Sequence, residues 1–205
     1  MDKKKIIGEI LNILCPYKLT LMLNKYRGKL YSLWVCGRKF KHISWAHFEG
    51  DIILRRTDRI SIGAHSSFER YSRIMVWPDV EGGNPNAELI IGTGCIIGEY
   101  NHITVANGIR IGNNLLTGRW VTITDNSHGE STMENIQTPP TKRKIFSKGQ
   151  VTIGNNVWIG DKCTILPNVK IGDCVIIAAN SVVTHDIPSL CVAGGNPAKI
   201  LKKIQ

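Results

Sequence analysis

Aliphatic residues recur at every sixth position in the C-terminal third of the chain. The run takes in Ile153, Ile159, Ile165, Ile171, Ile177 and Val183. An α-helix turns through about 3.6 residues and a flat strand alternates every two, so neither keeps such a series on one face. The six-residue period instead predicts a coil, in which short strands form the sides and the chain turns a corner after each hexad.

The same spacing appears earlier in the chain, although two longer segments interrupt it. It joins Ile62, Phe68 and Ile74, then Ile91, Ile97 and Ile103, and then Ile111, Thr117 and Ile123. The interruptions are residues 76–88 and residues 126–150. A long insertion in a coil has to leave at a corner and lie outside the stack, and such loops commonly carry binding and catalytic groups.

Stacked turns explain how so regular a chain buries its apolar surface. Three hexads, about 18 residues, close one triangular turn, and successive turns pair their backbones at roughly the 4.8 Å spacing of strands. Because a single turn cannot bury its own apolar face, stability comes from its neighbours. We therefore predict an all-β solenoid of about five hexapeptide coils between residues 60 and 188. The repeat itself leaves the handedness of the coil open.

The first 45 residues follow a helical period instead. Apolar residues at helical spacing are Ile6, Ile7, Ile10, Leu11 and Leu14, followed by Leu19, Leu23, Tyr26 and Leu30, with Pro16 between the two runs. We divide the chain into a helical N-terminal segment (1–45), the coil with its two loops (46–190) and a C-terminal tail (191–205). The N-terminal segment either caps the open end of the coil or lies against a membrane, since its polar face is rich in lysine.

Charge is concentrated in the first third of the chain. The 205 residues include 26 Lys or Arg and 16 Asp or Glu, for a formal net charge of +10. Residues 1–73 hold 15 of the basic and 6 of the acidic residues, and so carry +9 of that total. Such a surface suits nucleic acid or an anionic membrane, or is simply solvated. No apolar run approaches the roughly 18 residues that span a bilayer, so we expect no transmembrane segment.

The cysteines and histidines give no sign of a metal site. The 6 cysteines form no C-x-x-C pair and have no zinc spacing with histidine. Polar residues interrupt the stretch after the N-terminal lysines, so we expect no signal peptide, and reduced thiols in a cytosolic protein. His42 and His47 lie close in sequence, but no third ligand matches them, and we expect no metal.

Several motifs between residue 60 and the C-terminus resemble the hexapeptide-repeat acyltransferases. They are ITDNSHG (123–129) with the long loop after it, VTIGNNVWIG (151–160), the hexad containing SVVT (181–184), and AGGNPAK (193–199). Within that family the first two motifs resemble the O-acetyltransferases of bacterial surface polysaccharide assembly, to which maltose and galactoside acetyltransferases are similar. The N-terminal third departs from the maltose-acetyltransferase pattern.

The resemblance implies a left-handed parallel β-helix, a homotrimer, active sites between adjacent subunits, and acetyl-CoA as the acyl donor. His128 matches the general base, which would take the proton of a sugar hydroxyl as the hydroxyl attacks the thioester. Asp125, three residues earlier, either orients that imidazole or satisfies a turn. The backbone N–H of Asp161 matches the donor that stabilises the oxyanion.

Other residues match positions near the cofactor in that family. Trp158 precedes an inward isoleucine, so it lies outside the coil, where the pantetheine arm, the acceptor or another subunit would cover it. Asn101 is aligned, with a shift of at least one residue, with an asparagine on the neighbouring subunit near the reacting group. The remaining matches are Ala179, Thr184, His185 in place of the usual lysine, and Lys199 and Lys202 near the CoA phosphates.

The resulting hypothesis is an acetyl-CoA-dependent O-acetyltransferase that acts on a sugar hydroxyl in bacterial surface polysaccharide biosynthesis. Its acceptor is a sugar or glycan, free or lipid-linked, and no metal or nucleic acid takes part. The enzyme is cytoplasmic, either free or in peripheral contact with the inner membrane face through its basic N-terminal third. The alternatives are an N-acetyltransferase of an amino-sugar nucleotide, an acetyltransferase of a small acceptor such as serine or an antibiotic, and a non-catalytic β-helix scaffold.

Overall fold

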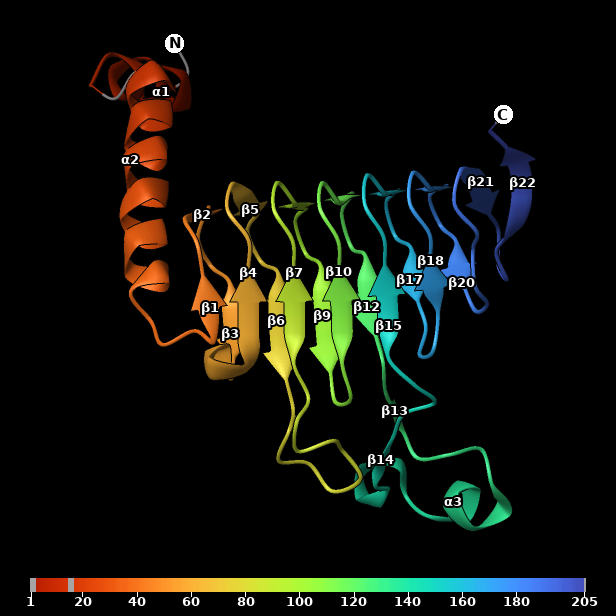
Figure 1. Ribbon diagram of the computed structural model, residues 1–205. Helices are drawn as coiled ribbons and strands as arrows, with labels where there is room; N and C mark the ends of the chain where they lie inside the picture. Colours follow the sequence, from red (N-terminus) through yellow and green to blue (C-terminus); the bar gives the residue numbers. More distant parts are fainter. Residues whose placement is uncertain (1–2, 15–16, 205) are drawn as a thin grey trace.

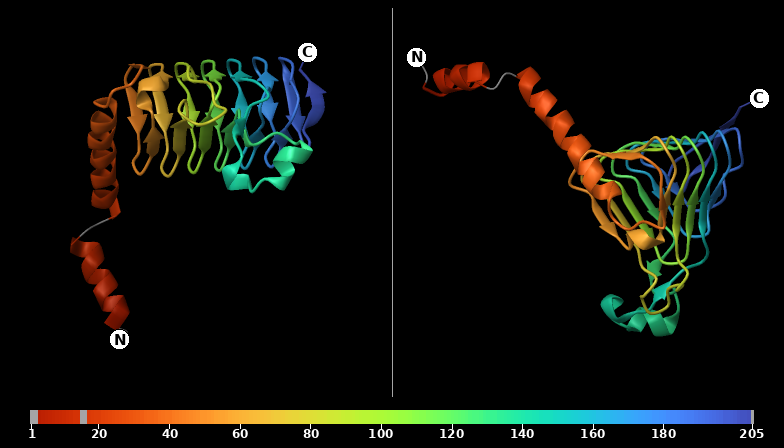
Figure 2. Two further views of the ribbon diagram at one scale, coloured as in Figure 1. Left: turned by 90° about the horizontal axis from the view of Figure 1, so that it is seen from below. Right: turned by 60° about the vertical axis from the view of Figure 1, so that its left-hand side comes forward.

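Two helices lead into a stack of short strands that visit three sheets in rotation (Figure 1). The computed structural model describes residues 3–14 and 17–204, so Pro16 lies outside the described residues. These two helices are α1 (Lys3–Leu14) and α2 (Tyr17–Cys36), and a 3₁₀ turn at Thr57–Arg59 leads into β4 (Ile60–Ile62). Figure 2 shows the triangular cross-section of the stack when it is viewed toward one end.

The three sheets of the stack are parallel except at one end. The first contains β1 (His42–Ile43), β4 (Ile60–Ile62), β7 (Leu89–Ile91), β10 (Ile109–Ile111), β15 (Val151–Ile153) and β18 (Lys170–Ile171). The second contains β2 (Ala46–Phe48), β5 (Ser66–Phe68), β8 (Ile96–Ile97), β11 (Leu116–Thr117), β16 (Trp158–Ile159), β19 (Ile176–Ile177), β21 (Cys191–Gly194) and β22 (Lys199–Lys203). The third contains β3 (Ile53–Arg55), β6 (Arg73–Val76), β9 (His102–Val105), β12 (Thr122–Thr124), β17 (Thr164–Ile165) and β20 (Val182–Val183).

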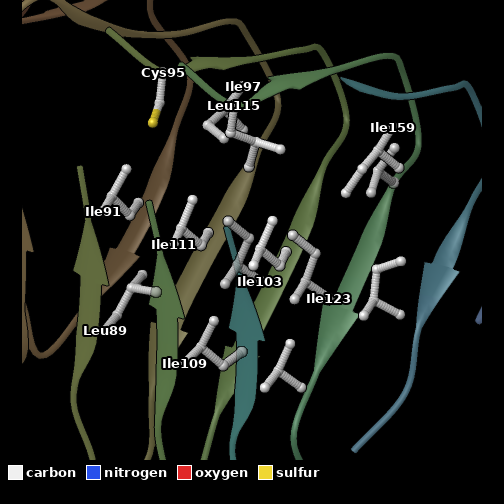
Figure 3. Close-up of a cluster of buried hydrophobic side chains, with 14 of the residues drawn as sticks. Leu89, Ile91, Cys95, Ile97, Ile103, Ile109, Ile111, Leu115, Ile123 and Ile159 are labelled. Atoms are coloured by element: carbon white, nitrogen blue, oxygen red, sulfur yellow. The ribbon is translucent and has the colours of Figure 1, made fainter. Parts of the chain in front are cut away.

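The six-spaced aliphatic residues fill the interior, as the repeat predicts. Ile153, Ile159, Ile165, Ile177 and Val183 are all at most 1% exposed. Each lies beside its counterpart in the next turn, so that the core is a set of aliphatic columns (Figure 3). Burying one such side chain stabilises the fold by about 1.5–3 kcal/mol relative to leaving it exposed.

Glycine follows many of these aliphatics because the turns approach closely at the corners. A Cβ on Gly92 would lie 2.5 Å from the carbonyl oxygen of Gly112, which is shorter than any carbon–oxygen contact tolerates. A Cβ on Gly112 would lie 2.8 Å from the backbone of Gly154. The column of glycines therefore allows the turns to stack at strand spacing.

Between residues 60 and 188 the chain makes 5 passes through the three sheets, beginning at β4, β7, β10, β15 and β18. A further pass, β1–β3, precedes them, so the strands begin at His42 rather than at residue 60. The hexad pattern is hard to see there because Ala46, Phe48 and Leu54 occupy the inward positions. The fold is mostly β, with few helices.

Helix α2 covers the first turn of the stack. Gly28, Ser32 and Val35 form its buried face, which packs on β2. The Phe48 N–H donates to Ser32 Oγ at 2.8 Å, and the Ile52 N–H donates to the Tyr31 hydroxyl at 3.1 Å. Side chains of α2 thus accept hydrogen bonds from backbone groups at the end of the stack, where no further turn precedes.

The last residues close the other end of the second sheet. The segment expected as a tail from residue 191 forms β21, which is parallel to β19, and β22, which runs antiparallel to β21. No helix that the structure describes is long and apolar enough to cross a membrane. The five described cysteines are free thiols.

Candidate active site

Two loops leave the stack at the corner between the third and first sheets. We call residues 77–88 the first arm and residues 126–150 the second arm; they extend from the same side in Figure 1. The second arm contains the antiparallel pair β13 (Ser127–His128) and β14 (Ile145–Phe146), helix α3 (Met133–Gln137) and a 3₁₀ turn at Pro140–Lys142. Both excursions predicted from the sequence therefore leave at a corner and lie outside the stack.

The middle of the first arm, at Glu81 and Gly82, is joined to β14 of the second arm (Figure 1). The Ile145 N–H donates to the Glu81 carbonyl oxygen at 2.8 Å, and Lys144 Nζ lies 2.8 Å from Glu81 Oε1. Gly82 sits at this contact with φ of +87°, and a Cβ there would lie 2.1 Å from the Ile145 carbonyl oxygen. Glycine is therefore required at position 82 by both its backbone conformation and its surroundings.

A cavity of about 500 Å³ lies between the arms and the outer face of the third sheet. Its floor comes from outward side chains of β6, β9 and β12, and its walls from the two arms. The residues that border it are Met75, Trp77, Val80, His102, Thr104, Ala106, Thr122, Thr124, Asn126, Ser127, His128 and Ile145. An aromatic wall with several hydroxyl and amide groups is suited to a small polar ligand that also has apolar faces.

His128 belongs to this cavity. It is exposed, and β13 holds it opposite Ile145 of β14. An accessible imidazole beside a ligand-sized cavity can remove a proton from a bound hydroxyl. His128, the predicted base, therefore borders a cavity that could hold a substrate. Most of the other residues that line this cavity were not identified from the sequence.

The Asp125 carboxylate forms hydrogen bonds with backbone N–H groups and not with His128. It is fully buried, and its carboxylate accepts hydrogen bonds from the N–H groups of Ala106 at 2.8 Å, Asn107 at 2.9 Å and Gly108 at 2.6 Å. Asn126 Nδ2 donates to the same carboxylate. Among the described residues, no hydrogen bond joins Asp125 to His128. Its alternative role, to satisfy the corner from which the second arm departs, is the one that the geometry favours.

His102 is a residue that the sequence analysis missed. It is the first residue of β9, points outward to the floor of the cavity, and lies between Arg73 and Thr122 on the neighbouring strands. Its Nε2 is buried and has no hydrogen-bond partner among the described residues. Burial, and to a lesser extent the charge of Arg73, lowers the pKa of this imidazole. Its outward position before Ile103 was readable, but the arms that cover it were not.

Asn101 lies inside the stack, and its contact with the cofactor stays a prediction. The side chain is 2% exposed. Its Nδ2 donates to the Gly98 carbonyl oxygen and Thr117 Oγ1, each at 2.8 Å, and its Oδ1 accepts from the Val121 N–H at 2.6 Å. All its polar atoms therefore serve to join adjacent turns of the stack.

Trp158 and Asp161 lie on a different part of the stack. Trp158 is exposed on the outer face of the second sheet, beside Leu116 and Ile176. Asp161 lies at the next corner, where its carboxylate accepts from the Arg119 N–H at 2.9 Å. The backbone N–H of Asp161 makes no hydrogen bond within the described part of the chain, so it remains available to an oxyanion.

The other cofactor candidates are spread along the C-terminal turns. Ala179 is exposed at the corner after β19, and Thr184 and His185 follow β20, with 2.8 Å between Thr184 Oγ1 and His185 Nδ1. Lys199 and Lys202 are exposed on β22. None of these residues borders the cavity of His128. Within one chain, the candidate base and the candidate cofactor positions are thus separate.

The part of the chain that the structure describes contains no group of three or more His, Cys, Asp or Glu residues that could hold a metal ion.

Comparison with known proteins shows that the chain is similar to hexapeptide-repeat transferases. Residues 150–185 match the family model described as bacterial transferase hexapeptide (six repeats). The chain is 40% identical over 111 residues to the putative lipopolysaccharide biosynthesis O-acetyl transferase WbbJ of Escherichia coli K12, covering 52% of this chain and 56% of that protein. It is 37% identical over 101 residues to the galactoside O-acetyltransferase of the same strain, covering 47% of this chain and 44% of the relative.

Among solved structures, the fold is similar to that of AntD, an N-acyltransferase from Bacillus cereus in complex with dTDP and 3-hydroxybutyryl-CoA. The TM-score is 0.68 at 16% identity, with 84% of this chain and 88% of AntD covered. The chain therefore has the fold of the hexapeptide-repeat acyltransferases, and the resemblance indicated by its motifs is confirmed. It spans about half the length of the two curated relatives, 56% and 44%.

Proposed function

We propose that this protein is an acetyl-CoA-dependent O-acetyltransferase that acetylates a sugar hydroxyl in bacterial surface polysaccharide biosynthesis. The observation that carries the proposal is the position of His128 beside a cavity of about 500 Å³ whose floor is lined with threonine and histidine side chains. Trp77 adds an aromatic wall, which suits the apolar face of a sugar ring. The curated relatives named as O-acetyltransferases support the same reaction.

In this mechanism His128 acts as the general base. Its imidazole takes the proton of the acceptor hydroxyl while the hydroxyl oxygen attacks the thioester carbonyl carbon of acetyl-CoA. The backbone N–H of Asp161 stabilises the negative charge on the carbonyl oxygen. When the carbon–sulfur bond breaks, the imidazolium returns the proton to the thiolate, which yields the sugar ester and free CoA.

The proposal includes a left-handed parallel β-helix assembled as a homotrimer, with each site shared between adjacent copies. It is supported by the separation of His128 from Trp158, Asp161 and Ala179 within one chain. A second copy that presents its coil face to the arms of the first would bring a base and a cofactor groove together. Thr184, His185, Lys199 and Lys202 would then extend that groove toward the CoA phosphates.

The acceptor is a sugar or glycan, free or lipid-linked, and the enzyme acts in the cytoplasm, either free or at the inner face of the membrane. An amine acceptor would instead give an amide. The two products differ chemically, since an ester is hydrolysed by mild base and an amide survives.

The first test is a thermal melt of the wild type and of His128→Ala, with and without acetyl-CoA. A ligand at 100 times its dissociation constant stabilises the folded state by about 2.7 kcal/mol, so both proteins should melt at a higher temperature when it is present. CoA release with a panel of sugar acceptors should then fall by about 10²-fold or more in His128→Ala.

His65→Ala replaces an exposed histidine on the stack and serves as the matched control, which should retain wild-type turnover. No melting shift in either protein would favour a scaffold or a different donor. A shift with full turnover by His128→Ala would remove the base from the mechanism while leaving the cofactor in place.

A further inference from the structure

The outer face of α2 is an apolar stripe that no other described part of the chain covers. Leu30 is 68% exposed, Leu33 57% and Trp34 63%. The stripe follows the spacing of one helix face, since its members recur at three- and four-residue intervals. We define it as Met22, Leu23, Tyr26, Leu30, Leu33 and Trp34.

The opposite face of the same helix is already used. Gly28, Ser32 and Val35 lie four and three residues apart and are buried against the first turn of the stack. The stripe therefore faces away from the coil, on the far side of the helix from β2. The helix is therefore packed on one face and apolar on the other, and an apolar phase can cover this outer face.

Basic residues flank the stripe, and no acidic residue on α2 balances their positive charge. Lys25 and Lys29 are exposed along one edge and Arg27 along the other. Helix α2 contains no acidic residue. Residues 1–41 together hold ten lysines and arginines against two acidic residues. Lysine and arginine can bury their aliphatic stems against an apolar phase and keep their charges at its edge.

We propose that α2 lies in the interface of an anionic phospholipid bilayer, with the stripe in the acyl boundary and the flanking lysines at the headgroups. Tyr26 and Trp34 are on the stripe, and their amphipathic rings suit the level of the headgroups. Ile7, Ile10 and Ile13 of α1 are also exposed. The docking does not depend on acyl transfer and holds for any substrate.

A second copy of the chain fits the stripe less well. Two stripes facing each other would bring the lysines and arginine of both helices together, without a carboxylate on either α2. Phospholipid headgroups supply the missing negative charge, and each basic residue near an anionic surface raises affinity by about fivefold.

The test is co-sedimentation of the full-length protein with vesicles of phosphatidylglycerol and phosphatidylethanolamine, beside vesicles of phosphatidylcholine alone. The wild type should bind the anionic vesicles and bind the neutral ones at least about tenfold more weakly. Leu30→Gln/Leu33→Gln, which shortens the stripe, and Lys25→Gln/Lys29→Gln, which removes flanking charge, should each lower the affinity by about tenfold or more.

Two matched variants control for loss of apolar surface and of charge elsewhere. Met133→Gln/Ile136→Gln removes two exposed apolar residues from α3 in the second arm. Lys162→Gln/Lys170→Gln removes two exposed lysines from the stack. Both should bind anionic vesicles as the wild type does. Circular dichroism and the melting temperature verify that every variant is folded.

Three results would overturn the proposal. One is a folded wild type that ignores anionic vesicles at low salt, and another is a Leu30→Gln/Leu33→Gln protein that binds them normally. The third is a change of oligomeric state in that variant, measured by sedimentation, without a change in vesicle binding, which would assign the stripe to a second copy. CoA release in the absence of vesicles reports separately on the proposed reaction.

Discussion

His102 combines two features that rarely occur together at a surface-facing position of a strand. Its Nε2 is buried without a partner, and the pKa of its imidazole is lowered by burial and by Arg73. A histidine with a lowered pKa is neutral at pH 7, so one ring nitrogen can donate a hydrogen bond to a hydroxyl group in the cavity or accept one from it. It stands on the floor of the same cavity as His128, so an acceptor sugar held there would meet two imidazoles.

The lowered pKa of His102 predicts a pH-dependent stability. In the unfolded chain the imidazole titrates near pH 6.5, while in the folded protein it takes up its proton only at lower pH. As the pH falls below about 6.5, the unfolded state binds a proton that the folded state does not, so the free energy of unfolding decreases. His102→Phe removes this loss.

Melting temperatures between pH 5 and pH 8 would measure the effect. We expect the melting temperature of His102→Phe to rise steadily relative to that of the wild type as the pH falls from about 7 to about 5. His42→Phe, a substitution of an exposed histidine, should show no such trend. A constant difference between wild type and His102→Phe over this range would mean that the imidazole is not held neutral.

Element by element, the repeat made the stack predictable, because an inward residue at every sixth position leaves a mark in the sequence. Its interruptions predicted the two loops, and the helical spacing of the first 45 residues predicted the N-terminal helices. The contact between the two arms was not predictable from the sequence. Glu81 and Ile145 are 64 positions apart and bind through backbone atoms, which every residue has. For the same reason the stacked rings of Tyr71, Tyr100 and Trp120, at centroid distances of 4.9 and 5.1 Å, could not be foreseen.

The sequence predicted a candidate site residue well where a motif showed that its side chain points out of the coil. It could not show where a side chain instead forms hydrogen bonds with buried backbone groups. Trp158 was placed outside by its position before Ile159. Asn101 and Asp125 looked equally suitable for a site, but the structure shows that their side chains serve buried backbone groups. A polar residue at a corner has either role, and only its neighbours in the adjacent turns distinguish them.

The contact between the arms predicts that Gly82 is needed for the site and not for the stack. In Gly82→Ala the new methyl group would collide with the Ile145 carbonyl oxygen, so the two arms would separate. Misplacing His128 by about 1 Å should lower turnover by about 10²-fold. The melting temperature should remain close to that of the wild type, because the arms lie outside the core.

Gly50→Ala is the matched control. Gly50 also has a positive φ, of +130°, but a Cβ there meets no atom within 4 Å. It should lose a little stability from backbone strain and keep its turnover. Equal turnover in Gly82→Ala and the wild type would show that the arms work without being joined.

For the whole molecule, a site shared between copies predicts that two inactive variants restore each other. His128→Ala disables the arm, and Ala179→Trp would block the exposed corner proposed to hold the cofactor. When the two are unfolded together and reassembled in equal amounts, roughly a quarter of the sites should combine an intact arm with an intact corner. Each variant alone should stay inactive.

The measurement is CoA release by the mixed assembly beside each variant treated in the same way. A gel-filtration profile at the position of a trimer controls for assembly. If each site is built within a single chain, mixing restores nothing, and the shared site is abandoned.

The hydrogen bonds from Phe48 to Ser32 and from Ile52 to Tyr31 occupy backbone groups at the open edge of the first turn. A stack of parallel turns presents at its end the same unpaired backbone that its interior turns use to bind one another, and such an edge can recruit further strands without limit. We expect α2, whose side chains occupy part of that edge, to oppose the end-to-end polymerisation of the column into a fibre.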